Sequence, residues 1–169
     1  KSLSVFNDGK RDGVFQEFHK KGGLKSTGFF SKGKREGKFI TISKNGFLEK
    51  IAFYKSGLLK DKTYWYFPSG ALQTEMTYKS NSAEGPAKKY YKTRETKAIL
   101  NLKNGTFHGE HKEYNQKGVL IKSDQYKNGL LNGIAKRFQE NGMIKYESNF
   151  KNGKKEGYFR TYYPNGPLF

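Results

Sequence analysis

The sequence predicts an all-β protein: an elongated, single-layer antiparallel sheet of stacked β-hairpin repeats, with a 24-residue period and about seven units. Three observations predict this fold. Glycines recur every 24 residues in three columns, aromatic residues keep the same period, and no insertion or deletion breaks the phase along the 169 residues. Helices are not expected, because each recurrent glycine would cost a helix interior about 1 kcal/mol.

The three glycine columns mark the turns of the predicted hairpins. Only Asn81 interrupts the first column, only Asp61 the second and only Arg94 the third. Asn-Gly and Asp-Gly pairs at many of these turns tolerate the positive φ angles that tight hairpins need. We therefore assign structural roles to the repeat glycines, among them Gly33, Gly129 and Gly153 in the first column, Gly37, Gly133 and Gly157 in the second, and Gly46, Gly142 and Gly166 in the third.

Each repeat is predicted to supply two short strands with one ring apiece. Residues 38–43 and 48–55 are the type example, because both are rich in Phe, Ile and Tyr. We expect rings to pack on rings of the neighbouring repeat, so that stability is a sum of nearest-neighbour contributions. One ring column contains Phe6, Phe30, Tyr54, Tyr78, Leu102, Tyr126 and Phe150, and the other contains Phe18, Ile42, Tyr66, Tyr90, Tyr114, Phe138 and Tyr162.

Residues 1–169 are expected to form a single repeat array. Lys1 enters in the middle of a predicted strand, and Phe169 stops as the next strand begins. Neither end has the polar outer face of a capping repeat. We therefore expect a segment of a longer array, or open edges that another chain or domain covers.

Composition limits the class of protein. The chain has 33 Lys and Arg against 15 Asp and Glu, a net charge of +18, no Cys, and 16% aromatic residues among only 34% hydrophobic ones. A disulfide framework, a thiolate metal site and a large aliphatic enzyme core are therefore not expected. The positive field favours anionic partners, but lysines far outnumber arginines, which argues against sequence-specific reading of nucleic acid. No apolar run has the length of a membrane span, and the compartment stays open because the first residue is not Met.

Two segments of the second half show the repeat motif most fully. One runs from Tyr126-Lys127-Asn128-Gly129 through Gly133, Phe138 and Asn141-Gly142 to Ile144, and the other is Phe150–Gly157 followed by Tyr162–Gly166. This motif resembles the variant MORN repeat that is common in bacterial proteins, and the resemblance covers essentially the whole chain. The eukaryotic form typically has His-Gly at the second glycine, and here only His108-Gly109 does. The resemblance implies hairpin repeats, no intrinsic catalysis, and roles in protein scaffolding or contact with anionic membranes. Some bacterial members are labelled antitoxin-like.

No grouping of residues predicts catalysis or a cofactor. The three histidines cannot be matched with a nucleophile, and the segment Gly28–Lys34 has P-loop spacing but is followed by Arg35 in place of Ser or Thr. His108, Glu110, His111 and Glu113 crowd together, but His111 occupies a repeat position that Phe15 and Phe39 hold elsewhere. We therefore interpret His111 as a ring in a ring position, predict no metal site, and interpret the repeated connector carboxylates Glu36 and Glu156 as structural.

A column of lysines directly follows the first ring column. In stacked hairpins these lysines would form a row about 10 Å apart along one edge. They could be a rail for an extended anionic partner or an anionic membrane, or they could block edge-to-edge pairing and keep the sheet soluble. The lysines are Lys55, Lys79, Lys103, Lys127 and Lys151.

The fourth repeat and the single tryptophan are further candidates for binding. The fourth repeat departs from the pattern at Asn81, Arg94 and Thr96, which marks either a functional surface or a degenerate unit that bends the sheet. Trp65 is either a binding hot spot or a residue that packs between repeats. The candidate binding residues of the fourth repeat are Lys88, Lys89, Tyr90, Tyr91, Lys92 and Arg94.

The sequence thus predicts a non-enzymatic repeat scaffold. Its expected partner is an acidic or extended protein segment bound on a basic, aromatic sheet face. The alternative is peripheral binding to an anionic lipid or glycan surface.

Overall fold

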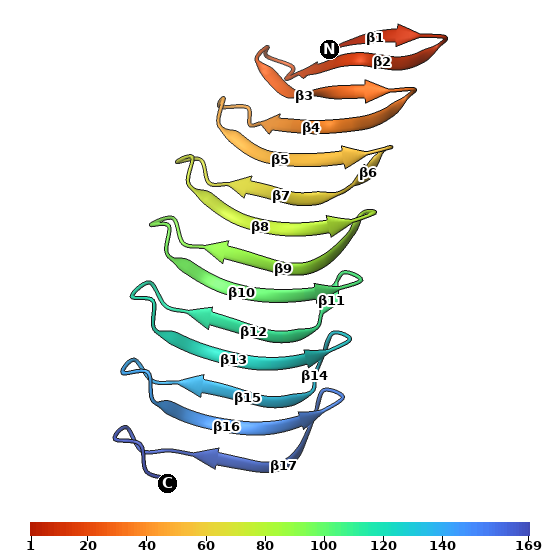
Figure 1. Ribbon diagram of the computed structural model, residues 1–169. Coiled ribbons are helices and arrows are strands. Elements are labelled where there is room, and N and C mark those ends of the chain that lie inside the picture. The colour runs from red at the N-terminus through yellow and green to blue at the C-terminus, as the bar shows by residue number, and fades with distance from the viewer. The chain divides into compact units, whose positions relative to one another are not determined.

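A computed structural model describes residues 1–169, and its regular structure is entirely β, with no helix (Figure 1). No segment therefore forms a helix long and apolar enough to cross a membrane. The chain divides into two compact units, Lys1–Ser82 (unit 1) and Ala83–Phe169 (unit 2). In each unit, strands that follow one another in the chain pair antiparallel in an open sheet, which confirms the predicted fold class.

Unit 1 is a series of hairpins in chain order. Each strand pairs with the next, and β5 pairs with both β6 and β7. The expected strands 38–43 and 48–55 correspond to β4 and β5. The strands are β1 Ser2–Asn7, β2 Lys10–Phe18, β3 Leu24–Ser31, β4 Lys34–Ile42, β5 Leu48–Lys55, β6 Leu58–Leu59, β7 Asp61–Tyr66 and β8 Leu72–Lys79.

Unit 2 repeats this arrangement, starting within β9. In three repeats of the chain the strand is divided one residue before the second glycine position, which gives the pairs β6/β7, β11/β12 and β14/β15. The strands are β9 Ser82–Tyr90, β10 Thr96–Lys103, β11 Thr106–Phe107, β12 Gly109–Tyr114, β13 Leu120–Lys127, β14 Leu130–Leu131, β15 Gly133–Phe138, β16 Ile144–Lys151 and β17 Lys154–Thr161.

The first glycine column forms the tips of two-residue hairpins in which both central residues have positive φ. Asn128 and Gly129, for example, have φ of 52° and 82°. From Gly33 onward, the amide of each such glycine donates to a backbone carbonyl 22 residues earlier, as from Gly57 to Arg35 at 2.8 Å and from Gly129 to Phe107 at 2.8 Å. These bonds tie each turn to the preceding repeat. The Glu36 carboxylate adds another such bond by accepting from the Ser56 amide at 2.7 Å, which is the structural role expected of Glu36.

The three exceptions to the glycine columns keep the glycine backbone. Asn81 has a φ of 69°, Asp61 of 62° and Arg94 of 81°, all left-handed. The Asn81 amide also donates to the Leu59 carbonyl at 3.1 Å, as a glycine in that position would. The period of the backbone is therefore independent of which residue fills the turn.

Rings form the core of unit 1. Phe15, Phe30 and Phe39 are buried, and Tyr54 packs against them. The ring centroids lie 5.3 Å (Phe15–Phe30), 5.6 Å (Phe30–Phe39) and 5.2 Å (Phe39–Tyr54) apart, all edge to face. A Cβ on Gly28 would lie 2.5 Å from the Phe39 ring, so this ring rests directly on the backbone.

Candidate functional site

One side of the unit 1 sheet is both aromatic and basic. We name it the ring face and define it by Phe15, Phe30, Phe39 and Tyr54 together with Arg11 and Arg35. The Arg11 Cζ lies 5.2 Å from the Phe15 centroid and 5.3 Å from the Phe30 centroid. The Arg35 Cζ lies 5.2 Å from the centroids of both Phe39 and Tyr54. Each guanidinium is therefore supported by two rings through cation–π attraction.

The ring face continues toward β7 and β8. Lys50 Nζ lies 5.7 Å from the Trp65 ring, and the Trp65 and Tyr78 centroids are 6.4 Å apart. Trp65 is half-buried, so it packs between neighbouring repeats while part of its ring stays accessible. Its role in binding remains a prediction.

The cations of the ring face have no carboxylate partner. The ion pairs of unit 1 involve other lysines, namely Lys25, Lys60 and Lys62. Arg11, Arg35 and Lys50 thus have no carboxylate oxygen within 4.0 Å. Their positive charge is not neutralised within the unit.

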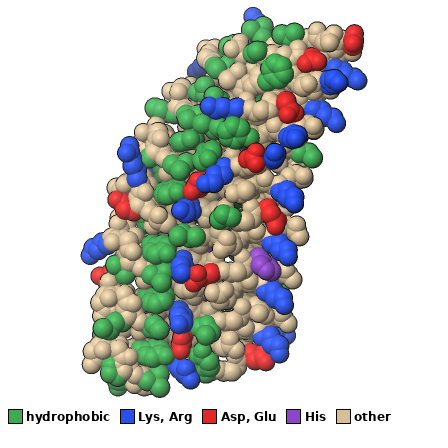
Figure 2. All heavy atoms as spheres, in the orientation of Figure 1, with side chains coloured by type: hydrophobic (Ala, Val, Ile, Leu, Met, Phe, Trp, Pro, Cys, Tyr) green, Lys and Arg blue, Asp and Glu red, His purple; other side chains and the backbone are tan.

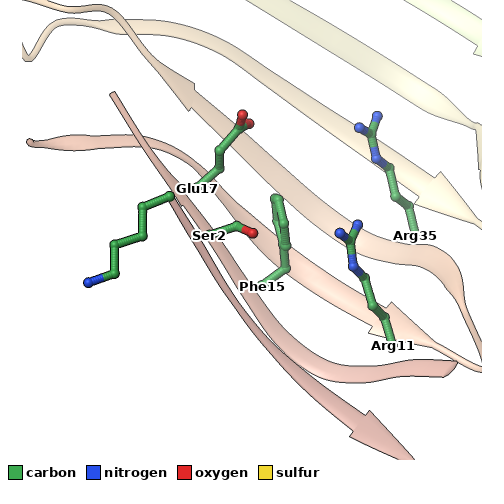
Figure 3. A pocket seen from close by; sticks show the side chains of 6 residues that line it. Ser2, Arg11, Phe15, Glu17 and Arg35 are labelled. Carbon is green, nitrogen blue, oxygen red and sulfur yellow. The ribbon is translucent and has the colours of Figure 1, made fainter. Parts of the chain in front are cut away.

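A cavity of about 390 Å³ opens beside the two arginines. Figure 3 shows the Arg11 and Arg35 side chains extending in the same direction, with the Phe15 ring beside Arg11. Glu17 also lines the cavity, where a 2.8 Å hydrogen bond from Lys25 lowers the pKa of its carboxyl group. The cavity residues are Lys1, Ser2, Arg11, Phe15, Glu17 and Arg35.

On the equivalent face of unit 2, the charged groups around Asp124 are paired with one another, while Lys155, at the repeat position of Arg11, lies 5.3 Å from the Phe159 centroid. Arg137 donates from both Nη atoms to the Asp124 carboxylate, which is 1% exposed. Lys122 Nζ lies 2.9 Å from Glu113 Oε1 and 3.5 Å from Asp124 Oδ2. Burial opposes ionisation of Glu113, but the Lys122 hydrogen bond and charge outweigh it and lower the pKa of Glu113. These cations neutralise carboxylates of the same unit.

His111 packs as a ring, as the repeat position predicts. Its centroid lies 5.3 Å from Phe107 and 5.9 Å from Tyr126. Burial, followed by the Lys122 charge, lowers the pKa of the imidazole. Its Nδ1 is buried without a hydrogen-bond partner. No group of three or more His, Asp or Glu side chains is arranged to hold a metal ion.

The predicted lysine column lies at the ends of the strands. Each of its lysines is exposed and is the last residue of its strand: Lys55 and Lys79 in unit 1, and Lys103, Lys127 and Lys151 in unit 2. Because successive strand residues point to opposite faces, the column faces away from the rings that it follows. In unit 2, Lys127 and Lys151 line one cleft of about 510 Å³, where Lys151 lies 3.4 Å from Glu156.

The candidate residues of the fourth repeat are not gathered into one surface. Lys88 and Lys89 are exposed but adjacent in β9, so they point to opposite faces. The Tyr91 hydroxyl donates to the Tyr114 carbonyl at 2.7 Å, which commits it to a contact between turns. Tyr90 is half-buried and pairs with Thr96 across β9 and β10. Lys92 and Arg94 are exposed in the turn.

Sequence reasoning missed Arg11 and Arg35. A signal was present, because two of the five arginines occupy the same repeat position, 24 residues apart. The position carries apolar residues or lysine in the later repeats, so it formed no visible column. Figure 2 shows how hydrophobic side chains form bands across the strands with Lys and Arg beside them.

Comparison with protein families finds a match to the MORN repeat variant. The match covers residues 62–80, in unit 1, and residues 107–128 and 131–152, in unit 2. These segments are similar to repeats that are generally non-catalytic and serve in binding. No curated protein matches the chain.

Proposed function

We propose that the protein is a non-catalytic repeat scaffold that binds an acidic, extended segment of a protein partner on the ring face of unit 1. One observation supports this proposal above the others: Arg11, Arg35 and Lys50 each lie over aromatic rings and have no carboxylate partner. A partner's carboxylates would supply the missing negative charge. The net charge of +18 would steer such a partner toward the protein.

The aromatic rings favour a protein partner over a simple anion. Packing on rings restricts each guanidinium before the partner arrives, which lowers the entropy lost on binding. Phe15, Phe30 and Phe39 are buried in their own cluster, but Tyr54, Trp65 and Tyr78 keep accessible ring surface for apolar groups of a polypeptide. In the antitoxin-like version of this proposal, the partner is a toxin protein with an acidic surface.

The experiment is a titration of the full chain with a fluorescent twelve-residue poly-glutamate peptide at low and high salt. The variant pair Arg11→Glu/Arg35→Glu is expected to weaken binding more than about tenfold, because both guanidinium contacts become repulsive. The control pair Lys20→Glu/Lys44→Glu makes the same change in net charge at exposed turn residues and is expected to weaken binding no more than about threefold. Absence of binding, or equal losses in the two pairs, contradicts the proposal.

A second candidate function is peripheral binding to an anionic lipid or glycan surface through the strand-end lysines. The cleft that contains both Lys127 and Lys151 favours it. It predicts co-sedimentation with phosphatidylserine vesicles, or retention on heparin, that is lost at high salt and in Lys127→Glu/Lys151→Glu. Retention that survives this pair contradicts the second candidate.

A further inference from the structure

We propose that Arg11 and Arg35 are two equivalent carboxylate receptors that read the spacing of acidic residues in the bound segment, an inference that rests on the proposed function. The two arginines occupy one repeat position, and their surroundings match closely. All four distances from a guanidinium carbon to a ring centroid are 5.2 or 5.3 Å. Two receptors of the same geometry at a fixed separation can discriminate between ligands by the distance between their carboxylates.

Both guanidinium groups have N–H donors that form no hydrogen bond within the protein. Arg35 donates from Nη1 to the Tyr54 hydroxyl at 3.1 Å, while Arg11 makes no hydrogen bond through its side chain within the protein. A guanidinium has five N–H donors in a fixed fork, and the fork matches a carboxylate in bidentate geometry. Each arginine can therefore bind one carboxylate while its face stays on the rings.

The cavity beside the arginines gives the ligand a direction. It reaches from Arg35 past Arg11 and Phe15 to Glu17 (Figure 3). Glu17 is already paired with Lys25 at 2.8 Å. The two arginines have no carboxylate partner, so acidic residues of the ligand belong there.

The distance between the receptors selects the backbone conformation of the ligand. Arg11 is in β2 and Arg35 in β4, with β3 between them, so equivalent positions are about 10 Å apart. A polyproline-II segment presents the same side every third residue, after about 9.3 Å. A β-strand presents the same side after about 6.8 Å, which is too short. The matching ligand is an extended segment with acidic residues three positions apart.

The test compares peptides of one composition and different spacing on the full chain. One twelve-residue peptide has Glu at every third position with Pro and Ala between them, and the other has the same residues with the glutamates adjacent. We expect the spaced peptide to bind about tenfold more tightly, because it reaches both arginines at once. This comparison uses the unaltered protein and does not depend on the folding of a variant.

Lysine substitutions then identify the receptors. Arg11→Lys and Arg35→Lys keep a cation over the rings but lose the bidentate fork, so each should weaken the spaced peptide about tenfold and remove its advantage. Arg160→Lys is the matched control, because Arg160 also lies over a ring, Tyr158 at 4.2 Å, but already contacts Glu147 at 3.5 Å. It should change binding less than twofold.

The outcomes separate this inference from the function on which it rests. Tight binding of both peptides without dependence on spacing, or without loss in the two lysine variants, overturns the receptor pair and leaves the scaffold proposal standing. Failure of every acidic peptide to bind overturns both. Phosphatidylserine vesicles that bind through the same two arginines would assign the site to lipid and overturn the peptide inference.

Discussion

Units 1 and 2 place opposite kinds of side chains at the same repeat positions. In unit 1, Phe39 pairs with Ala52 across β4 and β5, and the surrounding contacts are between rings. Seventy-two residues later, three repeats on, His111 pairs with Asp124 across β12 and β13. The His111 ring still contacts Phe107 and Tyr126, but Asp124 forms ion pairs with Lys122 and Arg137. The turns and strand register are shared, so the backbone pattern specifies the hairpins and leaves this face free to vary.

The two faces differ in the groups that their lysine and arginine side chains contact. On the ring face of unit 1, Arg11, Arg35 and Lys50 lie on rings, which attract them without cancelling their charge. In unit 2 Lys122 and Arg137 lie on carboxylates, which do cancel it. The first arrangement leaves charge available to a ligand, and in the second the cations compensate a buried carboxylate that would otherwise be unpaired. The following predictions test this division, beginning with the largest expected effect.

Removal of a central ring should break unit 1. Phe39→Ala is expected to lower the free energy of unfolding by about 3 kcal/mol or more, because Phe39 contacts Phe15, Phe30 and Tyr54 and its ring covers Gly28. Urea denaturation followed by aromatic fluorescence measures the change. The control Phe29→Ala removes a ring that is 45% exposed on the other face of β3 and should cost less than about 1 kcal/mol. Similar costs for the two would mean that the ring cluster is not the core.

Neutralisation of the central carboxylate should weaken unit 2 by a smaller amount. Asp124→Asn keeps the shape of the side chain but leaves Arg137 and Lys122 without their buried anion, at an expected cost of about 2 kcal/mol. The same denaturation measurement applies. Asp61→Asn is the control, because Asp61 is 68% exposed and Asn tolerates its left-handed backbone. An unchanged midpoint in Asp124→Asn would show that the buried pairs add no stability.

The repeat made the fold predictable from the sequence, including the ring role of His111. The left-handed backbone at Asn81 and Arg94 was not predicted, because both residues interrupt the glycine columns. The binding surface was less predictable. The sequence does not distinguish a lysine or arginine that lies on a ring, as Arg35 does, from one that lies on a carboxylate, as Arg137 does. The distinction depends on which side chains meet across strands, and register shifts such as the one between Thr27 and Phe29 alter those neighbours locally.

The smallest effect should come from making unit 2 resemble unit 1 at one position. Burial lowers the pKa of His111, so the folded chain takes up a proton less readily than the unfolded chain, whose imidazole has a pKa of about 6.5. The neutral His111 ring makes its full contribution to the free energy of unfolding above pH about 6.5, the pKa in the unfolded chain. This contribution declines as the pH falls through that value. The lowered pKa of Glu113 acts in a separate window, near the ordinary range of carboxyl groups.

His111→Phe should therefore remove the dependence of stability on pH between about 7.5 and 5.5 that this imidazole causes, while the stability at pH 8 changes by less than about 1.5 kcal/mol. Phenylalanine already fills the equivalent position at Phe15 and Phe39, and it eliminates the buried Nδ1 that has no partner. Thermal denaturation of both proteins across this range measures the effect. If the variant keeps the full pH dependence, the imidazole is not the group that titrates, and the contrast between the two faces does not extend to proton uptake.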